Sequence, residues 1–227
     1  MRESWLRVGP NVAPEFDETG RQKLVLYTLN GRERVTLRVS AEGGFSASDL
    51  AAAAQLLRSP GSGATHPIEP QLLQTVYALQ TYFAAPEVRV ISGYRMPKHG
   101  GGSNHGKGRA LDFVIPGVRN EELASYARSM GFKGVGTYPL SGFVHVDIRD
   151  RSYSWVDSSA PGKRNRERGV LGDVAAASDA AARARGEKPP PRYTLSALMP
   201  DPSATAPESD VPDDEEDGDD DELETAP

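Results

Sequence analysis

Hydrophobic and polar residues alternate in two short segments near the start of the chain, at residues 23–29 and 34–40. Both segments contain β-branched and aromatic residues, which are typical of strands. Asn30-Gly31 lies between them, and this dipeptide accepts the positive φ values of a tight type I′ turn. The pattern therefore predicts a β-hairpin closed by a type I′ turn.

The spacing of apolar residues becomes helical after Gly44. Residues 46–58 begin with capping residues and continue in alanine and leucine, which favours a helix. A second helix is predicted within residues 66–85, where five apolar residues recur at helical spacing: Leu72, Leu73, Val76, Leu79 and Phe83. His66-Pro67 precedes this helix, and we interpret His66 as a packed or capping side chain.

Short strands alternate with one more helix in the rest of the hydrophobic pattern. Strands are predicted at residues 88–92, 110–115, 134–138 and 142–148, and a helix at residues 121–130. Gly131 follows this helix as its C-cap. The pattern predicts an α+β fold, a single compact domain with a mainly antiparallel sheet packed by helices.

Composition divides the chain into three parts. Residues 1–19 form a polar, proline-containing arm that we expect to be flexible, and residues 20–157 form the predicted domain. Residues 158–227 are of low complexity and are expected to be largely disordered, with only a weak alanine-rich helix at residues 174–184. The acidic end, residues 208–224, carries twelve acids and no base, and such a run repels itself.

Charge, cysteine content and the length of apolar runs limit which metal ligands and partners the protein can use. Removing the twelve negative charges of the acidic end from the formal net charge of −6 leaves +6 for the rest of the chain. No cysteine is present, so a metal must be bound by imidazole and carboxylate groups. No apolar run reaches the ~20 residues of a membrane span. We predict neither a membrane span nor a nucleic-acid partner.

The candidate chemistry lies in residues 91–113 and 142–147. His105 and Asp112 are seven residues apart, and the intervening glycines permit the chain to fold back so that both side chains meet one ion. His145, on a neighbouring predicted strand, is the candidate third ligand. Asp147 follows it at strand period and faces the same side. The same pattern is also compatible with packed histidines and with Asp112 as a turn cap.

These motifs resemble a known family. SGYR at residues 92–95, S-x-H-x-x-G-x-A-x-D at residues 103–112 and H-x-D at residues 145–147 resemble the D-Ala-D-Ala carboxypeptidase-type zinc peptidases, whose superfamily includes the Hedgehog domain. The hairpin, HPIEP at residues 66–70 and the segment GVGTYPLSGFVHVD are most similar to the murein endopeptidase K branch. The resemblance covers about residues 22–155.

The resemblance implies a Zn²⁺ ion bound by His105, Asp112 and His145. It also implies that Arg95 contacts the substrate or the transition-state oxygen. The alternative is that Arg95 only pairs with an acid at the base of the loop.

Two departures from the family pattern affect the predicted site. Many relatives carry a glutamate three residues before the last histidine as general base, whereas this chain has Gly142. We consider Asp147 the best substitute, either as base or as the partner that orients His145, and Tyr138 a possible hydrogen-bond donor. His99 is a further candidate proton donor, although an exposed loop histidine is the simpler interpretation. The segment between SGYR and S-x-H is also short, at residues 96–102, which predicts a more open cleft.

The sequence thus predicts a zinc-dependent peptidase that hydrolyses amide bonds in peptidoglycan stem peptides. Because this substrate lies outside the cytoplasm, we expect a periplasmic or extracytoplasmic location, with an export signal missing from the sequence. One alternative is a catalytically inactive, zinc-stapled module that binds wall peptides or a protein partner. Another is that the acidic end recruits a basic partner and carries the function.

Overall fold

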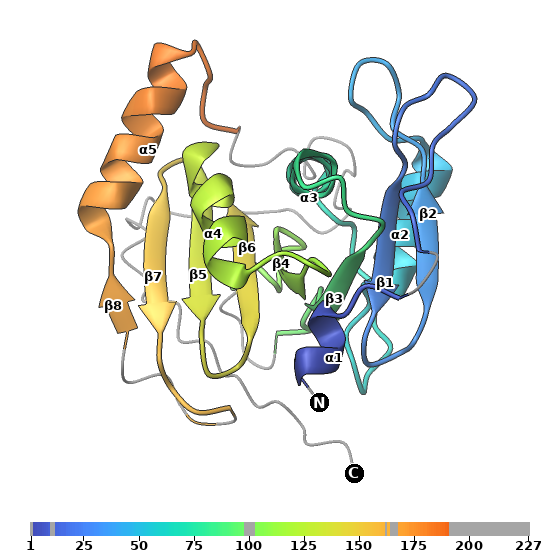
Figure 1. Cartoon of the computed structure of the whole chain (residues 1–227), viewed down its shortest axis with the longest axis horizontal. Helices are drawn as coiled ribbons and strands as arrows, with labels where there is room; N and C mark the ends of the chain where they lie inside the picture. Colours follow the sequence, from blue (N-terminus) through green and yellow to red (C-terminus); the bar gives the residue numbers. More distant parts are fainter. Residues whose placement is uncertain (1, 10–11, 98–102, 162, 164–167, 191–227) are drawn as a thin grey trace, which may run out of the picture.

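An eight-stranded sheet runs through the protein in the order β2-β1-β3-β4-β6-β5-β7-β8. The computed structural model describes residues 2–9, 12–97, 103–161, 163 and 168–190 (Figure 1). The strands are β1 (Leu24–Thr28), β2 (Arg34–Leu37), β3 (Val88–Ser92), β4 (Ala110–Val114), β5 (Lys133–Tyr138), β6 (Phe143–Ile148), β7 (Tyr153–Asp157) and β8 (Arg168–Val170). Only the pairs β1–β3 and β5–β7 are parallel. The predicted α+β class with a mainly antiparallel sheet is confirmed.

Helices pack with the sheet around one main core. They are α1 (Arg2–Leu6), α2 (Ala47–Leu56), α3 (Pro70–Tyr82), α4 (Asn120–Ser129) and α5 (Gly172–Ala184). Leu72 of α3 and Leu123 of α4 are fully buried against Phe113 and Val144 of the sheet. Because side chains alternate along a strand, the neighbours Asp112 and His145 point to the opposite face. Burial of the apolar positions on the helix side therefore fixes which residues face the candidate site.

The hairpin β1–β2 forms as predicted, but its turn is not type I′. Arg32 takes the left-handed conformation, with φ of 52°, instead of Asn30 and Gly31. The Arg32 N–H donates to the Thr28 carbonyl oxygen at 2.9 Å, which closes a longer loop. The Asn30 side chain donates to the carbonyl oxygen of Ile91 at 3.2 Å. A tertiary contact of Asn30 therefore replaces the local preference of the Asn-Gly pair.

The N-terminal arm contains a short docked helix. The Arg89 side chain donates hydrogen bonds to three backbone carbonyls at the end of α1, those of Ser4, Trp5 and Arg7, at 2.9–3.1 Å. Trp5 and Leu6 also pack against a second apolar cluster that includes Ile91. The arm predicted to be flexible therefore contains a short helix whose carbonyl groups are bound by an arginine of β3.

The folded chain also extends beyond residue 157, where the domain was predicted to end. β8 pairs with β7, and α5 packs against α4 and β7. Asp179 of α5 accepts hydrogen bonds from the Phe132 N–H at 2.8 Å and from the Ser152 N–H and hydroxyl at 2.9 and 2.6 Å. Ordered structure at residues 168–190 thus lies beyond the predicted boundary, where a polar anchor and buried alanines hold a helix with little apolar signal. The acidic end, residues 208–224, lies outside the described residues.

Candidate metal centre

His105 lies in the turn at residues 103–109, just before β4. Its Nδ1 lies 2.7 Å from the Gly93 carbonyl oxygen, and because a carbonyl only accepts, Nδ1 carries the proton. The other ring nitrogen, Nε2, faces into the site. The loop passes so close to the chain before α3 that a Cβ at Gly108 would meet the Pro67 carbonyl oxygen at 2.1 Å. Gly108 also has φ of +66°, so this turn requires glycine.

Asp112 and His145 come from adjacent strands and lie directly opposite each other in the β4–β6 register. His145 Nδ1 is 2.8 Å from Asp112 Oδ1 and 3.2 Å from His105 Nε2. His105 Nε2 is 3.4 Å from Asp112 Oδ2. All three side chains are buried, with at most 5% of each exposed. Sequence-distant residues are thus brought together as predicted.

Asp147 fixes the tautomer of His145. The carboxylate Oδ2 accepts from His145 Nε2 at 2.9 Å, which leaves Nδ1 as the nitrogen that faces His105 and Asp112. The same carboxylate also accepts from the Gly134 N–H at 3.1 Å and from two nitrogens of Arg149 at 2.7 and 2.8 Å. These contacts occupy both oxygens of Asp147, so the geometry favours the orienting role over the role of general base.

The three residues fit a metal ion. A tetrahedral ion with bonds of ~2.0–2.1 Å separates its ligand atoms by about 3.3–3.4 Å, close to the 2.8–3.4 Å found here. Two imidazole nitrogens and a carboxylate lie within 3.4 Å of one another, an arrangement that a cation stabilises. Among the described residues, His105, Asp112 and His145 are the group of metal-binding side chains that lies within 4.8 Å of one another.

The electrostatics of the pocket favour positive charge. Burial alone would lower the pKa of His145, but its hydrogen bonds to Asp112 and Asp147 outweigh burial and raise that pKa to about 10. Burial would raise the pKa of Asp112, yet the charges of His105 and Arg95 hold it well below its usual value. The pKa of Asp147 is likewise lowered, since the Arg149 charge and the His145 hydrogen bond outweigh burial. Both carboxylates are therefore ionised at neutral pH.

Arg95 lies at the edge of the cluster. Its Nη2 donates to Asp112 Oδ2, and its Nε donates to the Ser92 hydroxyl at 2.9 Å. The Arg95 side chain is 27% exposed, whereas the Asp112 side chain is 3% exposed. The structure thus places Arg95 between a proposed ligand and solvent. Its contact with substrate stays a prediction.

Tyr138 lies one layer away from the ligands. Its hydroxyl accepts from Trp155 Nε1 at 3.2 Å, and its ring stacks on Phe143 at 4.4 Å. The Trp155 ring lies between, 5.2 Å from the His145 ring. The catalytic role predicted for Tyr138 stays a prediction. Its contacts with Trp155 and Phe143 indicate that it supports the Trp155 ring, which packs beside His145.

The remaining candidates are placed as follows. Gly142 has φ of +81° in the turn before β6, where a glutamate would be strained, so the departure from the family pattern is built into the turn. His66 donates to the Pro67 carbonyl oxygen at 2.7 Å and stacks on Tyr94, as a packed histidine does. His99 lies outside the described residues.

The packing of Trp155 against the His145 ring was not predicted from the sequence. A Cβ at Gly136 would meet the Trp155 ring at 2.4 Å, so this glycine leaves the space that Trp155 fills. A Cβ at Gly134 would likewise meet a carboxylate oxygen of Asp147 at 2.3 Å. The signal was present in the sequence, since two glycines at strand period beside H-x-D indicate close approach of other groups.

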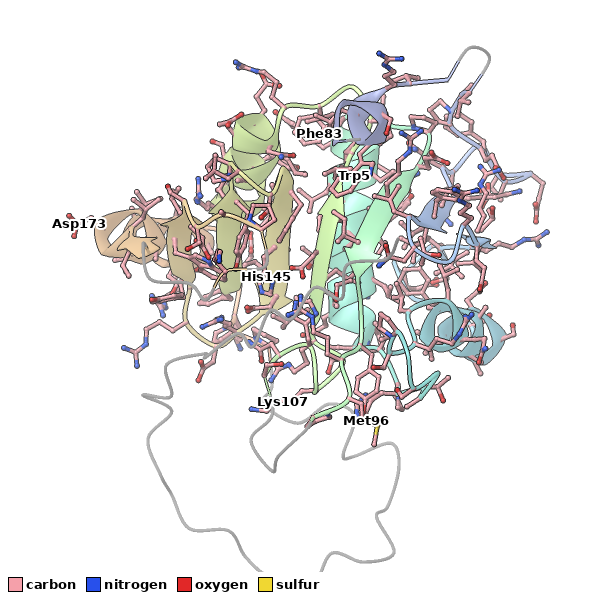
Figure 2. All side chains as sticks on the ribbon, turned by 90° about the horizontal axis from the view of Figure 1, so that it is seen from below. Trp5, Phe83, Met96, Lys107, His145 and Asp173 are labelled. Atoms are coloured by element: carbon pink, nitrogen blue, oxygen red, sulfur yellow. The ribbon has the colours of Figure 1, made fainter. Side chains whose placement is uncertain are left out.

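His145 lies in the interior of the molecule. In Figure 2 it is seen between Phe83, near the top of the view, and Lys107 and Met96, near the bottom. A buried His–Asp–His cluster with a carboxylate that orients one histidine is the kind of site found in metallopeptidases.

The chain matches the model of a known peptidase family. The family model described as peptidoglycan L,D-endopeptidase MepK, an M15-type peptidase, matches residues 17–153. The chain belongs to this family and is an enzyme of the peptidase class. A probable peptidoglycan L,D-endopeptidase MepK of Haemophilus influenzae is 31% identical over 169 residues, covering 64% of this chain and 91% of the relative.

Further relatives carry the same name. The peptidoglycan L,D-endopeptidases MepK of Escherichia coli K12 and of Shigella flexneri are each 32% identical over 136 residues. The match covers 55% of this chain and 75% of each relative. No solved structure matches. The predicted resemblance to the murein endopeptidase K branch is confirmed.

Proposed function

We propose that this chain is a zinc-dependent endopeptidase that cleaves an L,D amide bond in peptidoglycan stem peptides. The observation that carries the proposal is the convergence of His105 Nε2, His145 Nδ1 and Asp112 on one point, 2.8–3.4 Å apart, in a buried site. The names of the relatives support the bond type and the substrate. Two imidazoles and one carboxylate are also a ligand set that suits zinc.

Each residue of the site has its own proposed chemical role. When bound, zinc would polarise the scissile carbonyl and lower the pKa of a water molecule toward ~7. Gly93 and Asp147 fix the two histidine rings so that Nε2 of His105 and Nδ1 of His145 face the site, where a bound metal would replace any proton on them. Arg95, fixed by Ser92 and Asp112, supplies a partly exposed guanidinium for a substrate carboxylate or for the developing oxyanion.

The location follows from the substrate. Peptidoglycan lies outside the cytoplasm, so we propose an extracytoplasmic site of action. No helix among the described residues is both long and apolar enough to cross a bilayer. The +6 balance outside the acidic end would favour approach to an anionic wall through long-range attraction.

A second candidate function is a zinc-stapled module that binds wall peptides without cleaving them. Gly142 favours it, because the position that carries the base in many relatives has no side chain and a left-handed backbone. Under this alternative, the metal would stabilise the fold and the cleft would serve only for binding.

Digestion of purified muropeptides separates the two functions. The protein is incubated with muropeptides as purified, with a chelator, and with the chelator followed by excess zinc. The peptidase predicts cleaved stem peptides in the first and third reactions and none in the second. Stoichiometric, tightly bound zinc without turnover in any reaction would contradict the peptidase and support the binding module.

A further inference from the structure

We propose that Arg149 is a positioning residue of the metal centre, which acts on the ligand His145 through Asp147. The inference rests on the proposed metal-dependent function. Arg149 lies two residues after Asp147 near the end of β6, so the two side chains leave the sheet on the same face.

The contacts form a continuous chain toward the metal site. Arg149 Nε donates to Asp147 Oδ1 at 2.7 Å, and Arg149 Nη2 donates to Oδ2 at 2.8 Å. Such a bidentate pair fixes the carboxylate plane as well as its position. Asp147 Oδ2 in turn accepts from His145 Nε2 at 2.9 Å. The orientation of the Arg149 guanidinium therefore determines the orientation of the His145 ring.

The carboxylate of Asp147 depends on this arginine because it is completely buried, with 0% of its side chain exposed. A buried carboxylate needs a compensating charge and filled hydrogen-bond positions. Gly134 supplies one backbone N–H, and Arg149 supplies the charge and two further donors. Loss of the guanidinium leaves Asp147 free to rotate away from His145, which in turn loses its fixed tautomer.

The guanidinium is itself held by an aromatic wall. Its central carbon lies 5.2 Å from the ring centre of Tyr153 and 5.8 Å from that of Trp155, within the range of cation–π interactions. Trp155 also lies 5.2 Å from the His145 ring. One wall, on β7, therefore supports both the ligand and the arginine that orients it, which ties the position of Arg149 to the site.

Metal affinity tests the proposal directly. Arg149→Met removes the charge and the donors but keeps most of the side-chain length. We expect the zinc dissociation constant, measured by chelator competition at neutral pH, to rise about 10–100-fold, as when a residue that orients a metal ligand is lost. Arg119→Met is the matched control, because Arg119 is exposed and paired only locally with Glu122. The control is expected to bind zinc as the wild type does.

A double-mutant cycle distinguishes positioning from a general loss of stability. If Arg149 acts through Asp147, the double variant Asp147→Asn/Arg149→Met binds zinc no more weakly than Asp147→Asn alone. Additive losses in the cycle would overturn the proposal, as would wild-type affinity in a folded Arg149→Met variant.

Arg149→Lys keeps the proposal testable if Arg149→Met does not fold. Lysine keeps the charge but lacks the planar pair of donors, so we expect zinc binding several-fold weaker than in the wild type. An unchanged affinity would overturn the role of Arg149. Absence of zinc binding by the wild-type protein itself would refute the proposed function, which separates the two failures.

Discussion

His145 Nδ1 lies 2.8 Å from Asp112 Oδ1, across two antiparallel strands that pair these residues directly. This pairing joins residues that are far apart in the sequence, and His105 from the loop completes the cluster. The buried apolar neighbours Phe113 and Val144, which pair next to them, hold the register of the two strands. The candidate metal centre is therefore a consequence of strand pairing, and each supporting contact can be tested.

Removal of the space above Gly136 is expected to disturb the wall over His145. In Gly136→Ala, the new Cβ would meet the Trp155 ring at 2.4 Å, so the ring must move. Overpacking of this kind costs about 1–3 kcal/mol of unfolding free energy. Gly172→Ala is the matched control, because a Cβ there meets nothing within 4 Å. Denaturant unfolding that leaves Gly136→Ala as stable as this control would contradict the packing.

Asp179 gives a pH-dependent contribution to stability. Burial would raise the pKa of Asp179, but hydrogen bonds from Ser152 and from the Phe132 N–H outweigh burial and lower that pKa. The stabilisation is thus present above the unfolded pKa of about 4 and is lost as the pH falls through the lower folded value. We expect Asp179→Asn to unfold about 1–3 kcal/mol more easily at neutral pH, with the difference shrinking in acid.

Asp173→Asn is the control for that prediction, since it removes the same charge from an exposed position in the first turn of α5. Its effect is expected to stay below about 1 kcal/mol, the range of a charge near a helix N-terminus. Urea titrations at several pH values measure both variants. An Asp179→Asn deficit that persists unchanged at low pH would count against the ionised anchor.

Truncation tests where the folded domain ends. A chain ending at residue 190 keeps β8 and α5 and is expected to unfold at the wild-type temperature. A chain ending at residue 157 loses the contacts of Asp179 with Phe132 and Ser152 and the packing of Ala182, and is expected to unfold at a lower temperature. Equal melting temperatures for the two chains, measured by circular dichroism, would show that α5 contributes nothing.

The sequence predicts strands β1 to β6 and the residues of the His–Asp–His cluster, because both depend on local patterns. β3 was predicted at residues 88–92, as found, and His105, Asp112 and His145 were predicted from motifs. The C-terminal helix was underestimated because its buried residues include Asp179 and alanines, which give little hydrophobic signal.

Tertiary contacts explain the other differences. Asn30-Gly31 favours a type I′ turn locally, but Asn30 bonds to Ile91 on another strand. The contacts of Asp147 with Arg149 and Gly134, which favour its orienting role over that of a base, likewise form only in the folded sheet.

Arg95 is expected to matter for turnover more than for metal binding. Arg95→Lys keeps a charge beside Asp112 but loses the bidentate geometry that suits a carboxylate or an oxyanion. We expect kcat/KM on muropeptides to fall on the order of 100-fold, with zinc content unchanged. Arg58→Lys is the control, since Arg58 also pairs with a carboxylate, that of Glu33, but does not contact the His–Asp–His cluster. Wild-type turnover of Arg95→Lys would refute the substrate role.

Metal analysis of the purified protein and of two ligand variants tests the central claim most directly. The wild type is expected to hold one zinc ion per chain, and His105→Ala and His145→Ala are each expected to lose it, because two remaining ligands hold zinc poorly. His66→Ala, which changes a histidine outside the cluster, is expected to keep the metal. Stoichiometric zinc in either ligand variant, or none in the wild type, would contradict the assigned metal centre.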